Sequence, residues 1–256
     1  MERVTDRTAR VIARVLAADT PFVLVTGRPP RWIPRVARAA GLSGYAVCAN
    51  GASVYDIGAD EVLSVHDIDP VQLQDVVRAV EAVLPEMRVA AERTIVGRDT
   101  DHPFAIEEGF HNPWGNPNGE GDRAKLVPRA EVIGHAATKL LVRHRGMTSQ
   151  QMAEAVTTVV ADLAMEVTYS SNSGLIEISA AGVTKASGLA EVCELLDLAA
   201  GDVVAFGDMP NDEPMLRWVG HGVAMANAHP DLLAIADEVT APNSEDGVAQ
   251  VLERWF

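Results

Sequence analysis

The chain of 256 residues carries a formal net charge of −15 and is 48% hydrophobic. Its length allows one large domain or two modest ones, and its apolar residues can fill real cores. The negative charge argues against nucleic acid or an anionic membrane as a partner. Because the N-terminus lacks an apolar signal core and no apolar run is long enough to span a bilayer, we expect a soluble cytoplasmic protein, either a monomer or a homodimer.

The first 56 residues read as helix, strand, helix, strand. Thr5 is placed to cap the first helix, whose apolar stripe includes Val11 and Val15. An α/β alternation of this kind indicates parallel pairing of the strands. We therefore expect residues 1–56 to begin a doubly wound, Rossmann-like parallel sheet.

One of these strands ends in residues that suit anion binding. The apolar residues 22–25 are followed by Thr26, Gly27 and Arg28. A threonine can donate its hydroxyl, and a glycine lets a backbone amide approach an anion closely. An ordinary junction of strand and loop explains this segment alone just as well. The apolar residues 46–49 are followed by the turn dipeptide Asn50-Gly51.

The pattern of predicted helices and strands changes after residue 56. Residues 71–84 and 148–163 have helical patterns, the second opened by a Thr148/Gln151 capping box, and residues 139–142, 166–169 and 175–179 read as strands. Between them, residues 99–134 form a long stretch rich in Pro, Gly and Asn. We expect residues 57–181 to form an inserted α/β domain, with 1–56 and 182–256 as the discontinuous core.

Aromatic residues and histidines gather in the irregular stretch and its flank: His102, Phe104, Phe110, His111 and Trp114. They indicate either a lid over a bound substrate or a surface loop with aromatic anchors. Because exposed aromatic residues are ordinary, the second interpretation is favoured.

The segment after residue 181 opens a new helix. Thr184 resembles an N-cap, which puts Lys185 in the first helical turn, where a cation opposes the helix dipole. A misplaced cation hints at function, although a lone surface lysine is the commoner explanation. Cys193 lies on the apolar face of this helix and Cys48 in a strand, so both are expected to be buried free thiols.

The most informative segment is an apolar run, residues 203–206, that stops at Gly207 and Asp208 and is followed by a second carboxylate, Asp212. A run without polar alternation suits a strand buried on both faces. Its carboxyl end is where open α/β sheets place their ligands. Paired carboxylates there suggest Mg²⁺, although a turn followed by a helix cap explains one Gly-Asp pair alone.

Taken together, these segments resemble the haloacid dehalogenase-like superfamily and, within it, the Cof-type sugar phosphatases. The matching segments, in chain order, are residues 24–29, 49–52, 182–185, 206–212, 222–228 and 243–248. The resemblance implies a doubly wound parallel sheet with an α/β cap inserted after the third strand. It also implies Mg²⁺-dependent hydrolysis of a small phosphate monoester, a sugar phosphate, through an aspartyl-phosphate.

The same resemblance implies roles for individual residues. Those expected to take part in catalysis are Thr26, Lys185 and Asp208. Those expected to bind phosphate or substrate are Gly27, Arg28, Asn50, Gly51 and Asn211. The Mg²⁺ ligands would be Asp208 and Asp212, the second acting directly or through the water shell of the metal.

One departure limits the resemblance. The family's first motif, Asp-x-Asp-Gly-Thr, supplies the nucleophile and the general acid/base, and it is absent from this sequence. The chain begins about a dozen residues too late by this resemblance, so we expect the first core strand to be missing as well. The chain as given is then expected to be inactive or severely impaired.

Three alternatives stay open. The first is a phosphatase whose true start was missed, the second is a derived protein that binds phosphate or a sugar phosphate without turnover, and the third is a phosphosugar mutase or disaccharide-phosphate phosphatase relative. Asp67-Ile68-Asp69 offers a loose Asp-x-Asp pattern. However, it follows the Thr26 segment, and Asp69 with Pro70 reads better as a helix start.

Overall fold

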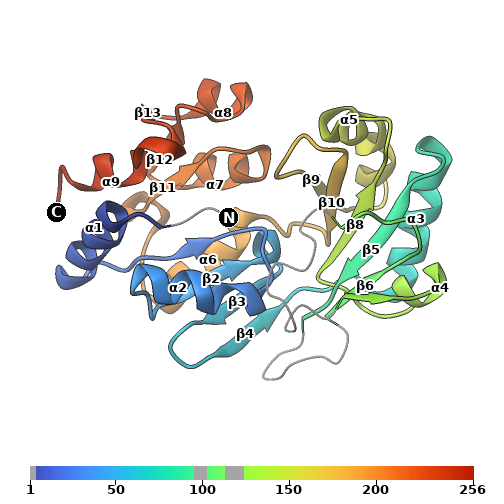
Figure 1. Cartoon of the computed structure of the whole chain (residues 1–256), viewed down its shortest axis with the longest axis horizontal. Coiled ribbons are helices and arrows are strands. Elements are labelled where there is room, and N and C mark those ends of the chain that lie inside the picture. Colours follow the sequence, from blue (N-terminus) through green and yellow to red (C-terminus); the bar gives the residue numbers. More distant parts are fainter. Residues whose placement is uncertain (1–3, 95–102, 113–123) are drawn as a thin grey trace. The chain divides into compact units, whose positions relative to one another are not determined.

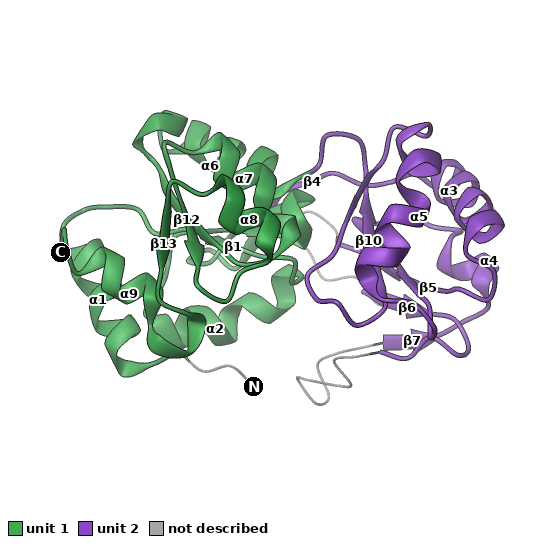
Figure 2. Cartoon of the chain, turned by 90° about the horizontal axis from the view of Figure 1, so that it is seen from above, with its two compact units in different colours: residues 1–61, 184–256 green, residues 62–183 purple. Residues whose placement is uncertain are grey.

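The computed structural model of the chain describes residues 4–94, 103–112 and 124–256. It divides into two compact units (Figure 2). Unit 1 comprises Met1–Glu61 together with Thr184–Phe256, and unit 2 comprises Val62–Val183. The roles of core and cap that the sequence suggested for the two parts of the chain stay predictions.

Helices and strands alternate through most of the chain (Figure 1). The α-helices are α1 (Asp6–Ala17), α2 (Ile33–Ala40), α3 (Pro70–Val83), α4 (Arg129–Val132), α5 (Ser149–Ala161), α6 (Lys185–Leu195), α7 (Glu213–Trp218), α8 (Pro230–Ile235) and α9 (Gly247–Leu252). The strands are β1 (Leu24–Val25), β2 (Tyr45–Cys48), β3 (Ser53–Asp56), β4 (Glu61–Val65), β5 (Arg88–Glu92), β6 (Phe104–Ile106), β7 (Ala124–Leu126), β8 (Lys139–Arg143), β9 (Glu166–Thr168), β10 (Leu175–Ser179), β11 (Val204–Gly207), β12 (His221–Met225) and β13 (Glu238–Thr240). Short 3₁₀ turns include η2 (Ala49–Gly51), η4 (Ala200–Asp202), η5 (Pro210–Asp212) and η6 (Asn243–Glu245).

Unit 1 confirms the α/β class, with mixed rather than purely parallel pairing of its strands. Strand β1 runs parallel to β2, with Leu24 opposite Ala46, and β11, β12 and β13 are parallel to one another, whereas β2 and β3 are antiparallel. The described strands of unit 1 lie in two sheets, β11-β12-β13 and β1-β2-β3-β4, and the last strand of the second sheet continues into unit 2. Both β1 and β11 are edge strands. That a further strand belongs with them stays a prediction.

Helices cover both faces of this core, as in a doubly wound fold. Ala205 of β11 packs into a cluster with residues of α6 and α7, whereas Phe206 packs against a cluster built from α1 and α9. Because neighbouring side chains of a strand point to opposite faces, β11 packs against apolar clusters on both faces, as its apolar run predicted. Cys48 and Cys193 are both buried free thiols, as predicted, and burial raises the pKa of the Cys48 thiol.

Unit 2 is built on one sheet of order β7-β6-β5-β8-β10-β9. Helices α3 and α5 pack side by side, and both begin at the residues that the sequence indicated. Asp69 caps α3 through hydrogen bonds from the amides of Val71 (2.7 Å) and Gln72 (2.9 Å). Thr148 caps α5 in a reciprocal capping box with Gln151. Asp69 is thus occupied as a helix cap, in agreement with the preferred interpretation of its sequence.

The stretch 99–134 is less irregular than the sequence suggested. Its described part contains β6, β7 and α4, and Phe104 and Phe110 are buried against each other edge to face, with ring centroids 6.3 Å apart. These two rings are core residues rather than part of a lid or surface anchors. His102 and Trp114 lie outside the described residues. Strands of three residues give too little alternation to stand out among Pro, Gly and Asn.

None of the described helices combines the length and hydrophobicity that a membrane crossing requires.

Candidate functional site

The strongest feature of unit 1 is a buried charged pair. Lys185 is the first residue of α6, and its ammonium group pairs with Oδ1 of Asp212. Thr184 caps the helix as predicted, because its Oγ1 accepts a hydrogen bond from the Ser187 amide (3.2 Å). Lys185 is only 6% exposed, so the explanation as a lone surface lysine is wrong. The Lys185 ammonium group, at the start of α6, is instead buried inside unit 1.

Asp212 organises the turn that follows β11. Its Oδ2 accepts hydrogen bonds from the backbone amides of Asp208 (3.0 Å) and Met209 (3.1 Å), while Oδ1 holds Lys185. A Cβ at Gly207 would lie 2.5 Å from Cβ of Asp212, so only glycine leaves room for this turn. Both Asp212 oxygens are therefore already engaged within the protein.

Asp208 stands directly after β11 and is half-buried. Its backbone carbonyl accepts a hydrogen bond from the His229 amide (2.8 Å). Its carboxylate Oδ2 accepts one from the side-chain amide of Asn243 (2.8 Å). The sequence did not single out Asn243 or His229 for a role, although Asn243 opens the last of the family-like segments.

Backbone hydrogen bonds tie the Thr26 turn to the end of β2. The Thr26 carbonyl accepts from the Asn50 amide (3.1 Å), and the Arg28 carbonyl accepts from the Ala49 amide (2.9 Å). Oγ1 of Thr26 accepts a hydrogen bond from the Arg28 amide (3.2 Å), which leaves its own hydroxyl hydrogen for another acceptor. Gly27 is half-buried and Arg28 is exposed in this turn.

The η2 turn has an unusual backbone. Ala49, Asn50 and Gly51 all have positive φ, at 50°, 61° and 105°. A Cβ at Gly51 would lie 1.9 Å from the carbonyl oxygen of Thr184, so no side chain fits there. Strained backbone of this kind clusters at functional sites. In η2, this backbone conformation lets the end of β2 pack closely against the start of α6, where Lys185 lies.

Two buried asparagines link the remaining segments. Nδ2 of Asn211 donates to Oδ1 of Asn50 (3.1 Å), and both side chains are at most 5% exposed. Oδ1 of Asn211 is also buried and has no hydrogen-bond partner in the described part of the chain. An amide oxygen can only accept, so it suits a hydroxyl or a water rather than an ionised phosphate oxygen.

These contacts bring the predicted site residues of the core into one network at the carboxyl ends of β1, β2 and β11. Thr26 contacts Asn50, Asn50 contacts Asn211, and Asp212 joins Lys185 to the Asp208 turn. Open α/β sheets bind their ligands at this edge. The loose Asp67-Ile68-Asp69 match lies in unit 2 instead.

Asp208 and Asp212 are the carboxylates of this network that could hold a metal ion. The described residues contain no group of three or more His, Cys, Asp or Glu side chains that could hold a metal ion. Mg²⁺ does not require such a group, since it usually keeps several waters and takes one or two carboxylates and substrate phosphates. Asp208 and Asp212 fit that pattern, and Asp208 suits direct ligation better because the Asp212 oxygens are engaged.

Comparisons with known proteins identify the family of the chain. The sequence profile described as haloacid dehalogenase-like hydrolase matches residues 1–252. A putative phosphatase of Haemophilus influenzae is 26% identical over 259 aligned residues, which cover 99% of this chain and 92% of the relative. The 5-amino-6-(5-phospho-D-ribitylamino)uracil phosphatase YcsE of Bacillus subtilis is 43% identical over 91 residues, 36% of each chain.

Solved structures give the same fold. The HAD subclass IIB sugar phosphatase BT4131 superposes with a TM-score of 0.79 at 20% identity, covering 99% of this chain and 92% of that one. At this level of identity the likeness establishes the fold, and the chemistry has to be argued from the site.

Proposed function

Because the chain belongs to the haloacid dehalogenase-like hydrolase family, we propose that its site binds a small phosphate monoester together with Mg²⁺. The observation that carries this proposal is the buried Lys185–Asp212 pair beside Asp208, at the carboxyl end of β11. A net charge of −15 repels anions, so an anionic substrate needs a local cation of this kind.

Phosphoryl transfer depends mainly on positioning and on stabilising the charge of the transferring group. In the proposal, the Lys185 ammonium, the Thr26 hydroxyl and the Gly27 amide surround the phosphate oxygens. The Lys185 ammonium is held in place by Asp212, and the Thr26 turn is held by the end of β2. Preorganised donors of this kind stabilise developing charge without further rearrangement.

Asp208 would hold Mg²⁺ directly, and Asp212 would contact its water shell. When bound, Mg²⁺ would neutralise charge on the phosphate oxygens. The buried acceptor Oδ1 of Asn211 would take a hydrogen bond from a metal-bound water or from a hydroxyl of the substrate.

For the substrate class we propose a sugar phosphate. Two similar proteins support this, because one is described as a sugar phosphatase and the other as a phosphatase of a phospho-ribityl compound. Arg28 and Asn50 of the core would contact the substrate, and unit 2 would supply specificity as a cap.

The catalytic step of the proposal is hydrolysis through an aspartyl-phosphate. The sequence of residues 1–256 contains no Asp-x-Asp-Gly-Thr motif to supply that nucleophile. We therefore expect residues 1–256 to bind phosphate and Mg²⁺ but to hydrolyse phosphate monoesters very slowly. The missing motif also favours a second candidate function, in which the protein binds a phosphorylated metabolite without hydrolysing it.

The test combines binding and turnover on residues 1–256. Phosphate and vanadate binding are measured by calorimetry with Mg²⁺, and hydrolysis of an aryl phosphate and a panel of sugar phosphates is followed with and without Mg²⁺. Anion binding with negligible turnover is the expected result. Robust Mg²⁺-dependent turnover would contradict the impairment and point to another nucleophile, whereas absence of anion binding would contradict the site itself.

A further inference from the structure

The carboxylate of Asp208 is held by a side chain from the far end of the sequence. Nδ2 of Asn243, in the turn η6, donates a hydrogen bond to Oδ2 of Asp208 across 35 residues of sequence (2.8 Å). We propose that Asn243 is a positioning residue, which fixes the Asp208 side chain in the orientation that binds a divalent cation. This inference rests on the proposed role of Asp208 as the Mg²⁺ ligand.

The main chain of Asp208 is already fixed on both sides. Its amide donates to Oδ2 of Asp212 (3.0 Å), and its carbonyl accepts from the His229 amide (2.8 Å). The hydrogen bond from Asn243 acts on the Asp208 side chain, and it helps to set where the carboxylate points.

An asparagine suits this task for an electrostatic reason. A lysine or arginine at the same place would neutralise the carboxylate and compete with a metal ion. A neutral amide donor occupies one of roughly four lone-pair sites of the carboxylate and leaves its negative charge in place. Asn243 can therefore orient Asp208 without removing the charge that a cation needs.

Asn243 is itself held in place. Its backbone amide donates to Oδ1 of Asn227, in the turn after β12 (2.7 Å), while its side chain reaches Asp208. Two hydrogen bonds from one residue fix both its position and its direction. The Asn243 donor is therefore organised before any ligand arrives.

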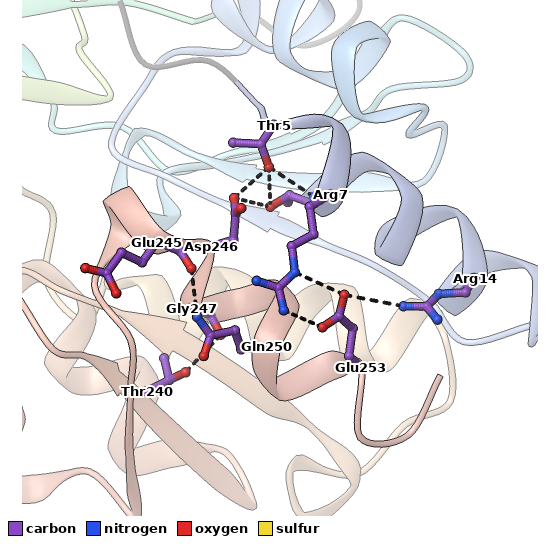
Figure 3. Close-up of polar contacts among 10 residues, drawn as sticks. Thr5, Arg7, Arg14, Thr240, Glu245, Asp246, Gly247, Gln250 and Glu253 are labelled. Carbon is purple, nitrogen blue, oxygen red and sulfur yellow. Dashed lines mark hydrogen bonds and ion pairs between the residues drawn. The ribbon is translucent and has the colours of Figure 1, made fainter.

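The turn that carries Asn243 is fastened to the helices α1 and α9 (Figure 3). Asp246 has a positive φ of 57°, and its Oδ1 accepts hydrogen bonds from the hydroxyls of Thr5 (2.6 Å) and Thr8 (3.1 Å). Nε2 of Gln250 donates to the Glu245 carbonyl (2.8 Å). Strained backbone persists only where its surroundings over-determine it, as they do here.

The experiment compares wild type with Asn243→Leu, Asp208→Ala and Gln250→Ala. The leucine matches asparagine in size but cannot donate, and Gln250→Ala loosens the same turn without touching Asp208. MgCl₂ is titrated into each protein by calorimetry. We expect Asn243→Leu to weaken Mg²⁺ binding about five- to tenfold, within the range for the net contribution of one hydrogen bond. Gln250→Ala should stay close to wild type, and Asp208→Ala should not bind.

A second measurement observes the hydrogen bond directly. In ¹H–¹⁵N spectra, the side-chain amide of Asn243 should move when Asp208 is replaced by Ala and should respond to MgCl₂ in wild type and Gln250→Ala. An unshifted Asn243 resonance in Asp208→Ala would show that this hydrogen bond is not formed in solution, and would overturn the positioning role. Thermal melts of all variants establish that they are folded.

The outcomes separate the inference from the proposed function. Wild-type Mg²⁺ affinity in Asn243→Leu, with binding lost in Asp208→Ala, would overturn the positioning role and leave the metal site intact. If Gln250→Ala weakened Mg²⁺ binding as much as Asn243→Leu does, the loss would come from a loosened turn. That result would also overturn the positioning role of Asn243. Unchanged Mg²⁺ binding in Asp208→Ala, or no binding by wild type, would overturn the metal assignment and the inference together.

Discussion

The ammonium group of Lys185 pairs with the carboxylate of Asp212, 27 residues further along the chain, and both side chains are buried. Burying two charges costs free energy that their attraction does not always recover, so such a pair is weak support for stability. The cation also opposes the dipole of α6, at whose start it lies. The proposed role of Lys185 in holding an anionic ligand would account for both features.

The first prediction concerns this pair. Lys185→Met should weaken binding of phosphate or vanadate by about 1–3 kcal/mol, the range for a charge-assisted contact. It should also lower the free energy of unfolding by about 3 kcal/mol, because the Asp212 charge is left buried without its partner. Calorimetry and denaturant unfolding measure the two effects.

A matched control exists in unit 2. Lys139 and Glu177 form a second buried pair (2.5 Å), with exposures of 4% and 2%. Lys139→Met should destabilise the protein to a similar degree and leave phosphate binding unchanged. If the two variants weakened anion binding equally, the assignment of Lys185 to the anion site would be wrong.

The second prediction concerns the close contact of Gly51 with Thr184. Gly51→Ala adds a methyl group 1.9 Å from the Thr184 carbonyl oxygen at a φ of 105°, so it should cost about 2–4 kcal/mol of stability. Urea unfolding measures the loss. The control is Gly201→Ala, since a Cβ at Gly201 meets no atom within 4 Å. Equal stability of the two variants would contradict the packing described for η2.

Much of this site could be predicted from sequence because its signals are local. A threonine before a helical stripe indicates a cap, and Thr5, Thr148 and Thr184 all cap the helices predicted for them. The apolar run before Asp208 likewise indicated a strand buried on both faces. β11 does pack against apolar clusters on both faces, through Ala205 and Phe206, but Val204 at its start is exposed. These patterns need only a few neighbouring residues to be recognised.

Other features depend on contacts between distant residues, and no local pattern encodes them. The burial of Lys185 is fixed by Asp212, and the orientation of Asp208 by Asn243, which is 35 positions away. The short strands β6 and β7 were missed since three residues carry almost no periodicity. The division of the unit 1 strands into two sheets also depends on which strands form hydrogen bonds with each other, and amino-acid composition does not reveal this.

The third prediction concerns the contact of α1 with the end of α9. Arg7 forms a double hydrogen bond with the Glu253 carboxylate (2.5 Å and 3.1 Å), which lowers the pKa of Glu253 from its ordinary value of 4.5 (Figure 3). A lowered folded-state pKa means that the stabilisation is complete above the unfolded pKa. It is lost as pH falls through the folded value.

Glu253→Gln tests this linkage. The variant should melt at a lower temperature than wild type at neutral pH, and the difference should shrink as pH falls below 4.5. Glu213→Gln is the control, because its partner Arg217 lies on the same helix. A difference that stayed constant over the acid range would show that the Arg7 contact does not stabilise the fold through the Glu253 charge.

We propose above all that Asp208 marks a Mg²⁺ site at the carboxyl end of β11. Calorimetric titration of Mg²⁺ into wild type, Asp208→Ala and Asp69→Ala tests it most directly, since Asp69 is a carboxylate engaged in capping α3. We expect Asp208→Ala to abolish binding, whereas Asp69→Ala should keep wild-type affinity and lose only about 1 kcal/mol of stability from the cap. Equal effects of the two substitutions on Mg²⁺ binding would contradict it.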